Sequence, residues 1–100
     1  MIGLSMILVC LEKLRGKLPI LKKQYGISSI GIFGSVARGD FHQHSDVDIL
    51  VAFNRVPSLF KIVRLERELS KILRLRVDLV LDISLDPIFR QQIIEEMFPV

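Results

Sequence analysis

Hydrophobic residues recur at helical spacing in three stretches of the chain. Between residues 4 and 25 they lie three or four positions apart, which predicts a helix. Pro19 lies inside this stretch, so we expect a kink there or a second short helix. Gly26 can then end the helical region in the left-handed conformation. Residues 58–73 place apolar side chains on one stripe and charged ones opposite, which predicts an amphipathic helix. A closing helix is predicted over residues 87–97.

Short apolar runs at residues 30–33, 47–53 and 77–81 predict three strands. Together with a turn or very short helix after the first strand, the order is helix, strand, short helix, strand, helix, strand, helix. This alternation predicts an α/β (α+β) fold, with helices packed on a small mixed sheet of three strands. The long helix between the second and third strands suits a crossover connection, so we expect those two strands to run parallel.

Two aspartates interrupt the apolar pattern where the second strand begins. Asp46 and Asp48 are two residues apart, so their side chains are expected on one face of that strand. Aspartate is disfavoured in strands, and an exposed strand start with one residue capping a turn would explain both. Asp78 also interrupts an apolar run, in the third strand. If the two strands are neighbours, Asp78 can share a face and a level with the other two.

Three carboxylates this close would repel one another, by about 4 kcal/mol for a pair at ~4 Å and an effective dielectric near 20. A divalent cation reverses the sign of that interaction, and oxygen ligands suit Mg²⁺ or Mn²⁺. Two such ions can clamp the attacking and leaving oxygens of a phosphoryl displacement. Asp82 is an alternative third acid, but four residues of strand separate it from Asp78 by roughly 13 Å. We therefore expect Asp78 in the site and Asp82 in a loop.

A glycine–serine turn follows the first strand. Gly34 lets the backbone approach a ligand closely, and Ser35 offers a hydroxyl and can cap the short helix. Backbone N–H groups at such a turn bind phosphate, and Arg38 could pair with a phosphate oxygen. An ordinary turn and a solvated arginine are the alternatives for these residues.

Composition limits the class of protein without naming a function. One hundred residues predict a single domain over residues 1–100, and the formal charge of +3 suits anionic ligands. Cys10 is the only cysteine, so a disulfide within the chain or a thiolate-rich zinc site is excluded; we expect a buried thiol and a cytoplasmic protein. The apolar stretch 2–11 is far too short to span a membrane. Because the chain lacks interleaved aromatics and a basic stripe, no direct nucleic-acid binding is expected.

The arrangement Gly34-Ser35, ten residues, then Asp46-Val47-Asp48 resembles the signature of the DNA polymerase β-type nucleotidyltransferase superfamily. The fuller strings 33–39 and 45–51 resemble the minimal nucleotidyltransferases in particular. Residues 57–60 and 76–80 are similar to later segments of that family, so the resemblance covers nearly the whole chain from about residue 14. It implies a nucleotidyltransferase fold.

The resemblance also implies roles for individual residues. Gly34 and Ser35 would hold the triphosphate of ATP. Asp46 and Asp48 would bind two Mg²⁺ ions. Asp78 would complete the metal site and help to deprotonate the acceptor hydroxyl.

Arg38 also matches a family position, and we expect it in the nucleotide-binding site. His42 and His44 stand where the family tends to carry small or acidic residues. We expect them to be solvated loop residues, with a minor contact to nucleotide or acceptor as the alternative.

Minimal nucleotidyltransferases resemble antitoxins encoded beside HEPN-domain toxins, which are RNases. The resemblance implies transfer of AMP from ATP to a tyrosine of such a toxin, which silences it. The apolar residues 97–100 could contact this partner, although core packing explains them equally well. An antitoxin that only binds and masks its partner is the alternative function.

Overall fold

The computed structural model describes residues 2–40, 42 and 45–100, and of residues 2–5 only the backbone. Its elements follow the predicted order, with two short additions near the C-terminus. They are α1 (Ile2–Tyr25), β1 (Ile27–Phe33), α2 (Ser35–Arg38), β2 (Val47–Phe53), α3 (Leu59–Leu73), β3 (Val77–Leu81), the 3-10 helix η1 (Asp82–Ser84), α4 (Pro87–Glu96) and β4 (Phe98–Pro99).

The strands form one mixed sheet in the order β3-β2-β1-β4. Strand β1 is antiparallel to β2, and β2 is parallel to β3, which confirms the predicted crossover through α3. The sheet has four strands instead of the predicted three. Phe98 and Pro99 add the fourth by pairing with Ile32 and Gly31 of β1. A two-residue strand that contains a proline is too short to show the alternation of a strand, so the sequence pattern gave no signal for it.

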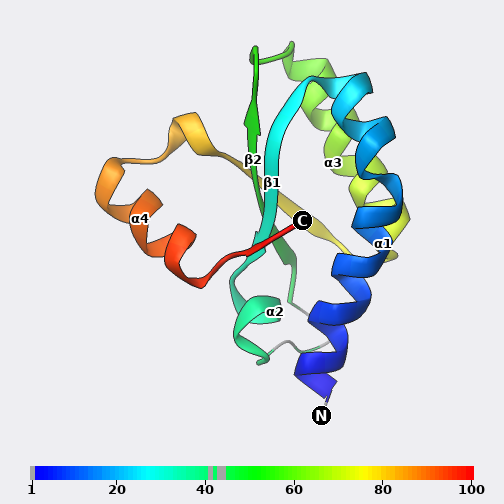
Figure 1. Cartoon of the computed structure of the whole chain (residues 1–100), viewed down its shortest axis with the longest axis vertical. Coiled ribbons are helices and arrows are strands. Elements are labelled where there is room, and N and C mark those ends of the chain that lie inside the picture. Colours follow the sequence, from blue (N-terminus) through cyan, green and yellow to red (C-terminus); the bar gives the residue numbers. More distant parts are fainter. Residues whose placement is uncertain (1, 41, 43–44) are drawn as a thin grey trace.

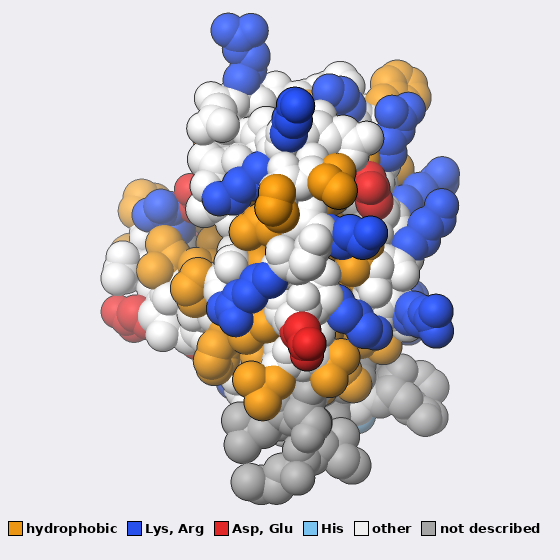
Figure 2. Space-filling view, turned by 45° about the vertical axis from the view of Figure 1, so that its right-hand side comes forward, with side chains coloured by type: hydrophobic (Ala, Val, Ile, Leu, Met, Phe, Trp, Pro, Cys, Tyr) orange, Lys and Arg blue, Asp and Glu red, His pale blue; other side chains and the backbone are white. Residues whose placement is uncertain are grey.

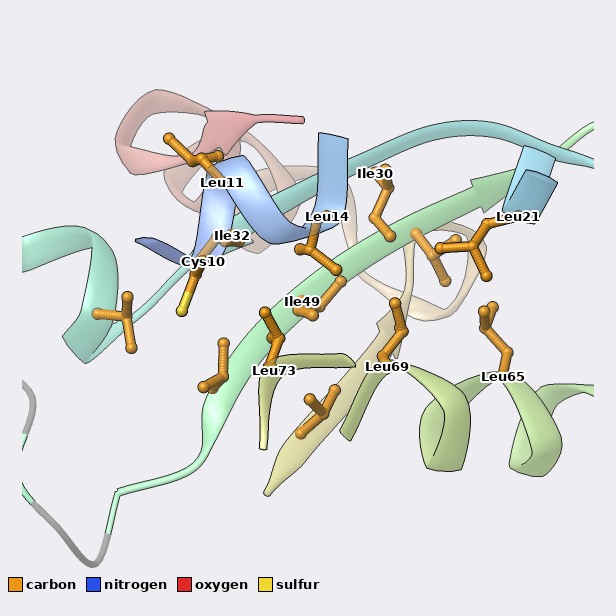
Figure 3. Packing of buried hydrophobic residues seen from close by; sticks show 14 of the residues in the cluster. Cys10, Leu11, Leu14, Leu21, Ile30, Ile32, Ile49, Leu65, Leu69 and Leu73 are labelled. Atoms are coloured by element: carbon orange, nitrogen blue, oxygen red, sulfur yellow. The ribbon is translucent and has the colours of Figure 1, made fainter. Parts of the chain in front are cut away.

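Helices cover both faces of this sheet. Figure 1 shows α1 and α3 side by side on one face and α4 on the other. The main core lies under α1 and α3, where the β2 residues Val47, Ile49 and Val51 are 0% exposed. Figure 3 shows Leu14 of α1 and Leu69 of α3 converging on Ile49. The alternation of β2 therefore sends its odd-numbered residues to this core and its even-numbered residues toward α4.

Capping residues account for the ends of two helices. Ser58 is the N-cap that precedes α3, and its side chain accepts a hydrogen bond from the Lys61 backbone N–H at 3.3 Å. Gly26, at φ +69°, ends α1 as predicted. Helix α1 runs through Pro19, so no second helix begins there, and the predicted kink stays a prediction. Pro19 is exposed, and the buried Leu21 that follows it packs α1 against the sheet; we attribute the continuity to this packing.

Cys10 is buried in the core as predicted, and burial raises the pKa of its thiol. Within the described part of the chain, every helix is too short or too polar to cross a membrane.

Charge is divided unevenly between the two faces. Helices α1 and α3 carry nine of the fourteen Lys and Arg residues but only three of the eleven acids. Figure 2 shows Lys and Arg side chains spread over the face formed by these helices, with hydrophobic side chains between them. The remaining acids outnumber the remaining cations. The part of the molecule outside these two helices therefore favours the binding of cations.

Tyr25 links the two helices that cover the core. Its side chain is 3% exposed, and its hydroxyl donates to Glu68 Oε2 of α3 at 2.5 Å. Burial, and then the bond to Glu68, raise the pKa of Tyr25 to about 12. A raised phenol pKa means that the folded state disfavours the phenolate. This contribution to stability is complete below pH 10 and is lost as the pH rises toward 12.

We therefore expect Tyr25→Phe to lower the free energy of unfolding by about 1–2 kcal/mol at pH 8. We expect the gap between wild type and variant to narrow between pH 10 and 12. Urea titrations of both proteins across this range measure the gap, and the titration of lysines is common to both. A gap that stays constant up to pH 12 would contradict this role of the phenol.

Candidate functional site

The register of the sheet brings two of the predicted acids together. Asp48 of β2 pairs with Asp78 of β3 on one side and with Phe33 of β1 on the other. Because Val47 and Ile49 point into the core, Asp48 points to the opposite face, toward α4. Residues paired in register on neighbouring strands project to the same face. Asp48 is half-buried there and Asp78 is exposed.

The pKa of the Asp48 carboxyl group is raised by burial, and two neighbouring acids contribute to this shift. Burial is the largest cause that raises the pKa of its carboxyl group, followed by the charges of Asp78 and Asp46. The Asp48 and Asp78 carboxyl groups lie within hydrogen-bonding reach of each other, while the Arg38 charge acts in the opposite direction. Two carboxylates side by side are unfavourable at neutral pH unless a cation compensates them.

Asp46, the third predicted acid, has a basic partner of its own. It precedes β2, and its carboxylate lies 3.4 Å from Nε of Arg76. The pairing of Val47 with Val77 explains this contact, because the residues that precede these two paired positions are Asp46 and Arg76. Asp48 and Asp78 are thus paired in register, while Asp46, whose charge also acts on Asp48, is paired with Arg76. In the described ranges 2–40, 42 and 45–100, no three His, Cys, Asp or Glu side chains form a group that could hold a metal ion.

Gly34 lies directly against Asp48. Its backbone has φ +76° and ψ −149°, a conformation that residues with a side chain rarely adopt. A Cβ atom built on Gly34 would lie 2.1 Å from Oδ2 of Asp48. The sequence argument required glycine for the approach of a ligand. The structure adds a second reason for glycine: the Asp48 carboxylate fills the space that a side chain at position 34 would need.

The turn after β1 differs in detail from the prediction. Gly34, and not Ser35, is the N-cap of α2, and no side chain caps this helix. Ser35 is the first helical residue. Arg38 is exposed but paired, with Nε 3.5 Å from Asp40 and Nη1 3.3 Å from Glu96. Arg38 is thus an exposed side chain held by two acids, and its predicted pairing with a phosphate oxygen stays a prediction.

Glu96 is a site residue that sequence reasoning missed. Its Oε1 accepts a hydrogen bond from the Gly34 backbone N–H at 3.0 Å and lies 3.3 Å from Arg38 Nη1. It is the last residue of α4, 62 positions from Gly34, and nothing in its local sequence distinguishes it from a solvated helix residue. A cavity of about 330 Å³ lies between α4, the turn and Asp48. Its lining includes Phe89, Gln92 and Glu96.

The remaining candidates lie outside this cluster. Asp82 is in η1, where its carboxylate pairs with Arg90 of α4. It follows β3 directly, in a 3-10 helix instead of the predicted loop. His42 is exposed, and its backbone N–H donates to Ser45 Oγ at 3.4 Å. The expectation for His44 lies outside the described residues.

The donor set at this site fits a divalent cation of the magnesium type. The carboxylate oxygens of Asp48 and Asp78 are hard ligands. Burial first, and then the charges of Asp78 and Asp46, raise the pKa of Asp48, although the Asp46 carboxylate itself pairs with Arg76. Beside these acids, the Gly34 turn and Arg38 supply donors for an anion.

Comparison with known proteins gives consistent results. Residues 14–99 match the model of the nucleotidyltransferase domain family. The protein adenylyltransferase MntA of Thermococcus cleftensis is 44% identical over 77 residues, which cover 77% of this chain and 78% of the relative. A solved structure of a candidate minimal nucleotidyltransferase is 37% identical with a TM-score of 0.77, covering 90% of this chain and 92% of that one. A chain from a toxin–antitoxin complex with AMP-PNP is 27% identical with a TM-score of 0.69. The match covers 84% of this chain and 69% of that one.

Proposed function

The chain belongs to the nucleotidyltransferase domain family, and from this membership we propose that it is a magnesium-dependent protein adenylyltransferase. It transfers AMP from ATP to an acceptor hydroxyl. The observation that carries the proposal is the pairing of Asp48 with Asp78 beside the Gly34 turn. Transfer of a nucleotidyl group requires a cation site next to a phosphate site, and this pairing supports such an arrangement.

Each residue has a proposed role in this reaction. Asp48 and Asp78 hold the metal, and Asp46 joins them by turning away from Arg76. Gly34 and Ser35 hold the triphosphate through backbone N–H and hydroxyl groups. When bound, Mg²⁺ neutralises charge on the triphosphate and on the reacting oxygens.

In the proposed step, the acceptor oxygen forms a bond to the α-phosphorus of ATP. The bond from the α-phosphorus to the oxygen that bridges to the β-phosphate breaks, and pyrophosphate leaves. The hydroxyl proton passes to the carboxylate of Asp78, which is one of the two aspartates paired across β2 and β3. Most of the catalytic effect comes from positioning and from compensation of charge.

The proposed acceptor is a tyrosine of a partner HEPN toxin, and its modification silences the toxin. Two observations support this choice. The Thermococcus cleftensis relative is named a protein adenylyltransferase, and a similar solved chain belongs to a toxin–antitoxin complex with AMP-PNP. A partner of this kind makes the protein an antitoxin.

The proposal is tested by incubating the protein with Mg²⁺, α-labelled ATP and the product of the neighbouring gene. We expect label on the partner, and mass spectrometry of the partner should show the added mass of AMP on tyrosine. ATP labelled at the γ-phosphate is the matched control, because that label leaves with pyrophosphate. Tight binding of the partner without any label would instead support an antitoxin that only masks its partner.

A further inference from the structure

Glu96 occupies the place where the proposed function puts a phosphate. Its carboxylate accepts from the Gly34 N–H and pairs with Arg38, and these are two donors of the predicted triphosphate site. A carboxylate oxygen and a phosphate oxygen make the same hydrogen bonds to such donors. One donor pair cannot fully serve both anions, so a bound triphosphate must displace Glu96.

The position of Glu96 is defined by the segment that follows it. Beyond Glu96 the chain passes over β1, where Met97 lies so close to Gly31 that a Cβ atom there would meet its sulfur. Phe98 and Pro99 then pair with β1, and the Val100 N–H donates to Ile30 at 2.9 Å.

Arg15 of α1 adds a third attachment for the same segment. Its guanidinium donates to the carbonyl oxygens of Pro99 and Val100, at 3.1 and 3.2 Å. The C-terminal segment is thus attached to the sheet edge and to a core helix. These attachments hold the end of α4 beside the Gly34 turn.

Charge makes the competition stronger. Glu96 and Asp48 line the same cavity, so the negative charge of Glu96 adds to that of the acid pair. Without Glu96, the Gly34 N–H and Nη1 of Arg38 would both be available to an incoming anion, while Nε of Arg38 stays beside Asp40. We propose that Glu96 is a built-in competitor of the nucleotide triphosphate, which lowers nucleotide affinity until α4 or its C-terminal segment moves. This inference rests on the proposed function, because it takes the Gly34 turn as the triphosphate site.

The matched pair of variants is Glu96→Gln and Glu95→Gln. Both remove one negative charge from the last turn of α4, but Glu95 is exposed and has no described contact with the Gly34 turn. Calorimetric titration with Mg²⁺ and α,β-methylene-ATP measures affinity without turnover. We expect Glu96→Gln to bind this analogue about threefold to tenfold more tightly than wild type, and Glu95→Gln to bind as wild type does. Inorganic tripolyphosphate should show the same order, because the competition concerns phosphate and not the base.

The outcomes separate this inference from the proposed function. Equal or weaker binding by Glu96→Gln, in a protein that still transfers AMP, would overturn the competitor role and leave the transferase standing. Equal gains in both variants would show a general charge effect and would also overturn it. Absence of binding in all three proteins, with thermal melts that show them folded, would reject the triphosphate site itself.

Discussion

Asp48→Asn is expected to abolish AMP transfer while making the metal-free protein more stable. Asp48 is the half-buried member of the acid pair, and its neutral amide is a far weaker ligand for Mg²⁺. We expect transfer to fall on the order of a thousandfold or more, because charge compensation supplies most of the catalytic effect. Transfer from α-labelled ATP is the measurement. Retained transfer in the folded variant would contradict the assignment of the metal site.

The gain in stability follows from the sign of the pKa shift. The pKa of Asp48 is raised in the folded state, so the folded protein binds its proton more tightly than the unfolded chain does. Stability from this group is present at low pH and is lost as the pH rises through the raised pKa. Asparagine cannot lose a proton, so the variant should escape that loss. Urea unfolding should show a gain that is larger at pH 7 than at pH 4.

Two comparisons make the Asp48 experiment specific. Asp82→Asn neutralises an acid of η1 that pairs with Arg90 outside the cluster, and it should leave transfer close to wild type. Addition of Mg²⁺ should raise the melting temperature of wild type but not that of Asp48→Asn, since binding to the folded state alone stabilises it. A large loss of transfer in Asp82→Asn would indicate that the wrong acid was chosen.

Gly34→Ala is expected to cause the second large effect, a loss of both stability and nucleotide binding. Alanine is strained at φ +76°, and its Cβ would collide with Oδ2 of Asp48. The strain costs about 1–3 kcal/mol in this region of φ and ψ, and the collision adds about 1–3 kcal/mol because the carboxylate must move. The displaced carboxylate would disturb the acid pair, and the turn would lose its donor geometry. Urea unfolding and titration with α,β-methylene-ATP measure the two losses.

Gly26→Ala separates the strain from the collision. Gly26 also has a positive φ, +69°, but no atom lies within 4 Å of a Cβ built there. It should lose only about 1–2 kcal/mol and bind nucleotide as wild type does. The double variant Gly34→Ala with Asp48→Gly removes the colliding group, so it should recover part of the stability but none of the transfer. Equal destabilisation by the two alanine variants would contradict the contact between Gly34 and Asp48.

Much of the fold is encoded in local patterns of the sequence. The apolar runs of β2 and β3 predicted both strands with their observed ends, and the stripe of α3 predicted that helix to within one residue. Alternation along the strands also predicted that Asp48 and Asp78 share a face. The strands and the helix depend on spacing within one segment, so neighbours in the sequence determine them, whereas the shared face of the two acids also needed the pairing of β2 with β3. The fourth strand escaped prediction because Phe98 and Pro99 become a strand only by pairing with β1.

The amino-acid sequence by itself determined which side chains could carry the chemistry. These are the aspartates and the glycine turn, whose spacing resembles that of the family's motif. Only the tertiary structure decided which other side chains meet them. Asp46 faces Arg76 because the starts of two parallel strands coincide, and Glu96 reaches Gly34 across 62 positions because α4 folds back over the sheet. Contacts of this kind arise from the register of strands and the packing of helices. Both depend on how segments far apart in the sequence bury their apolar faces in one core, and the local spacing of residues does not reveal this.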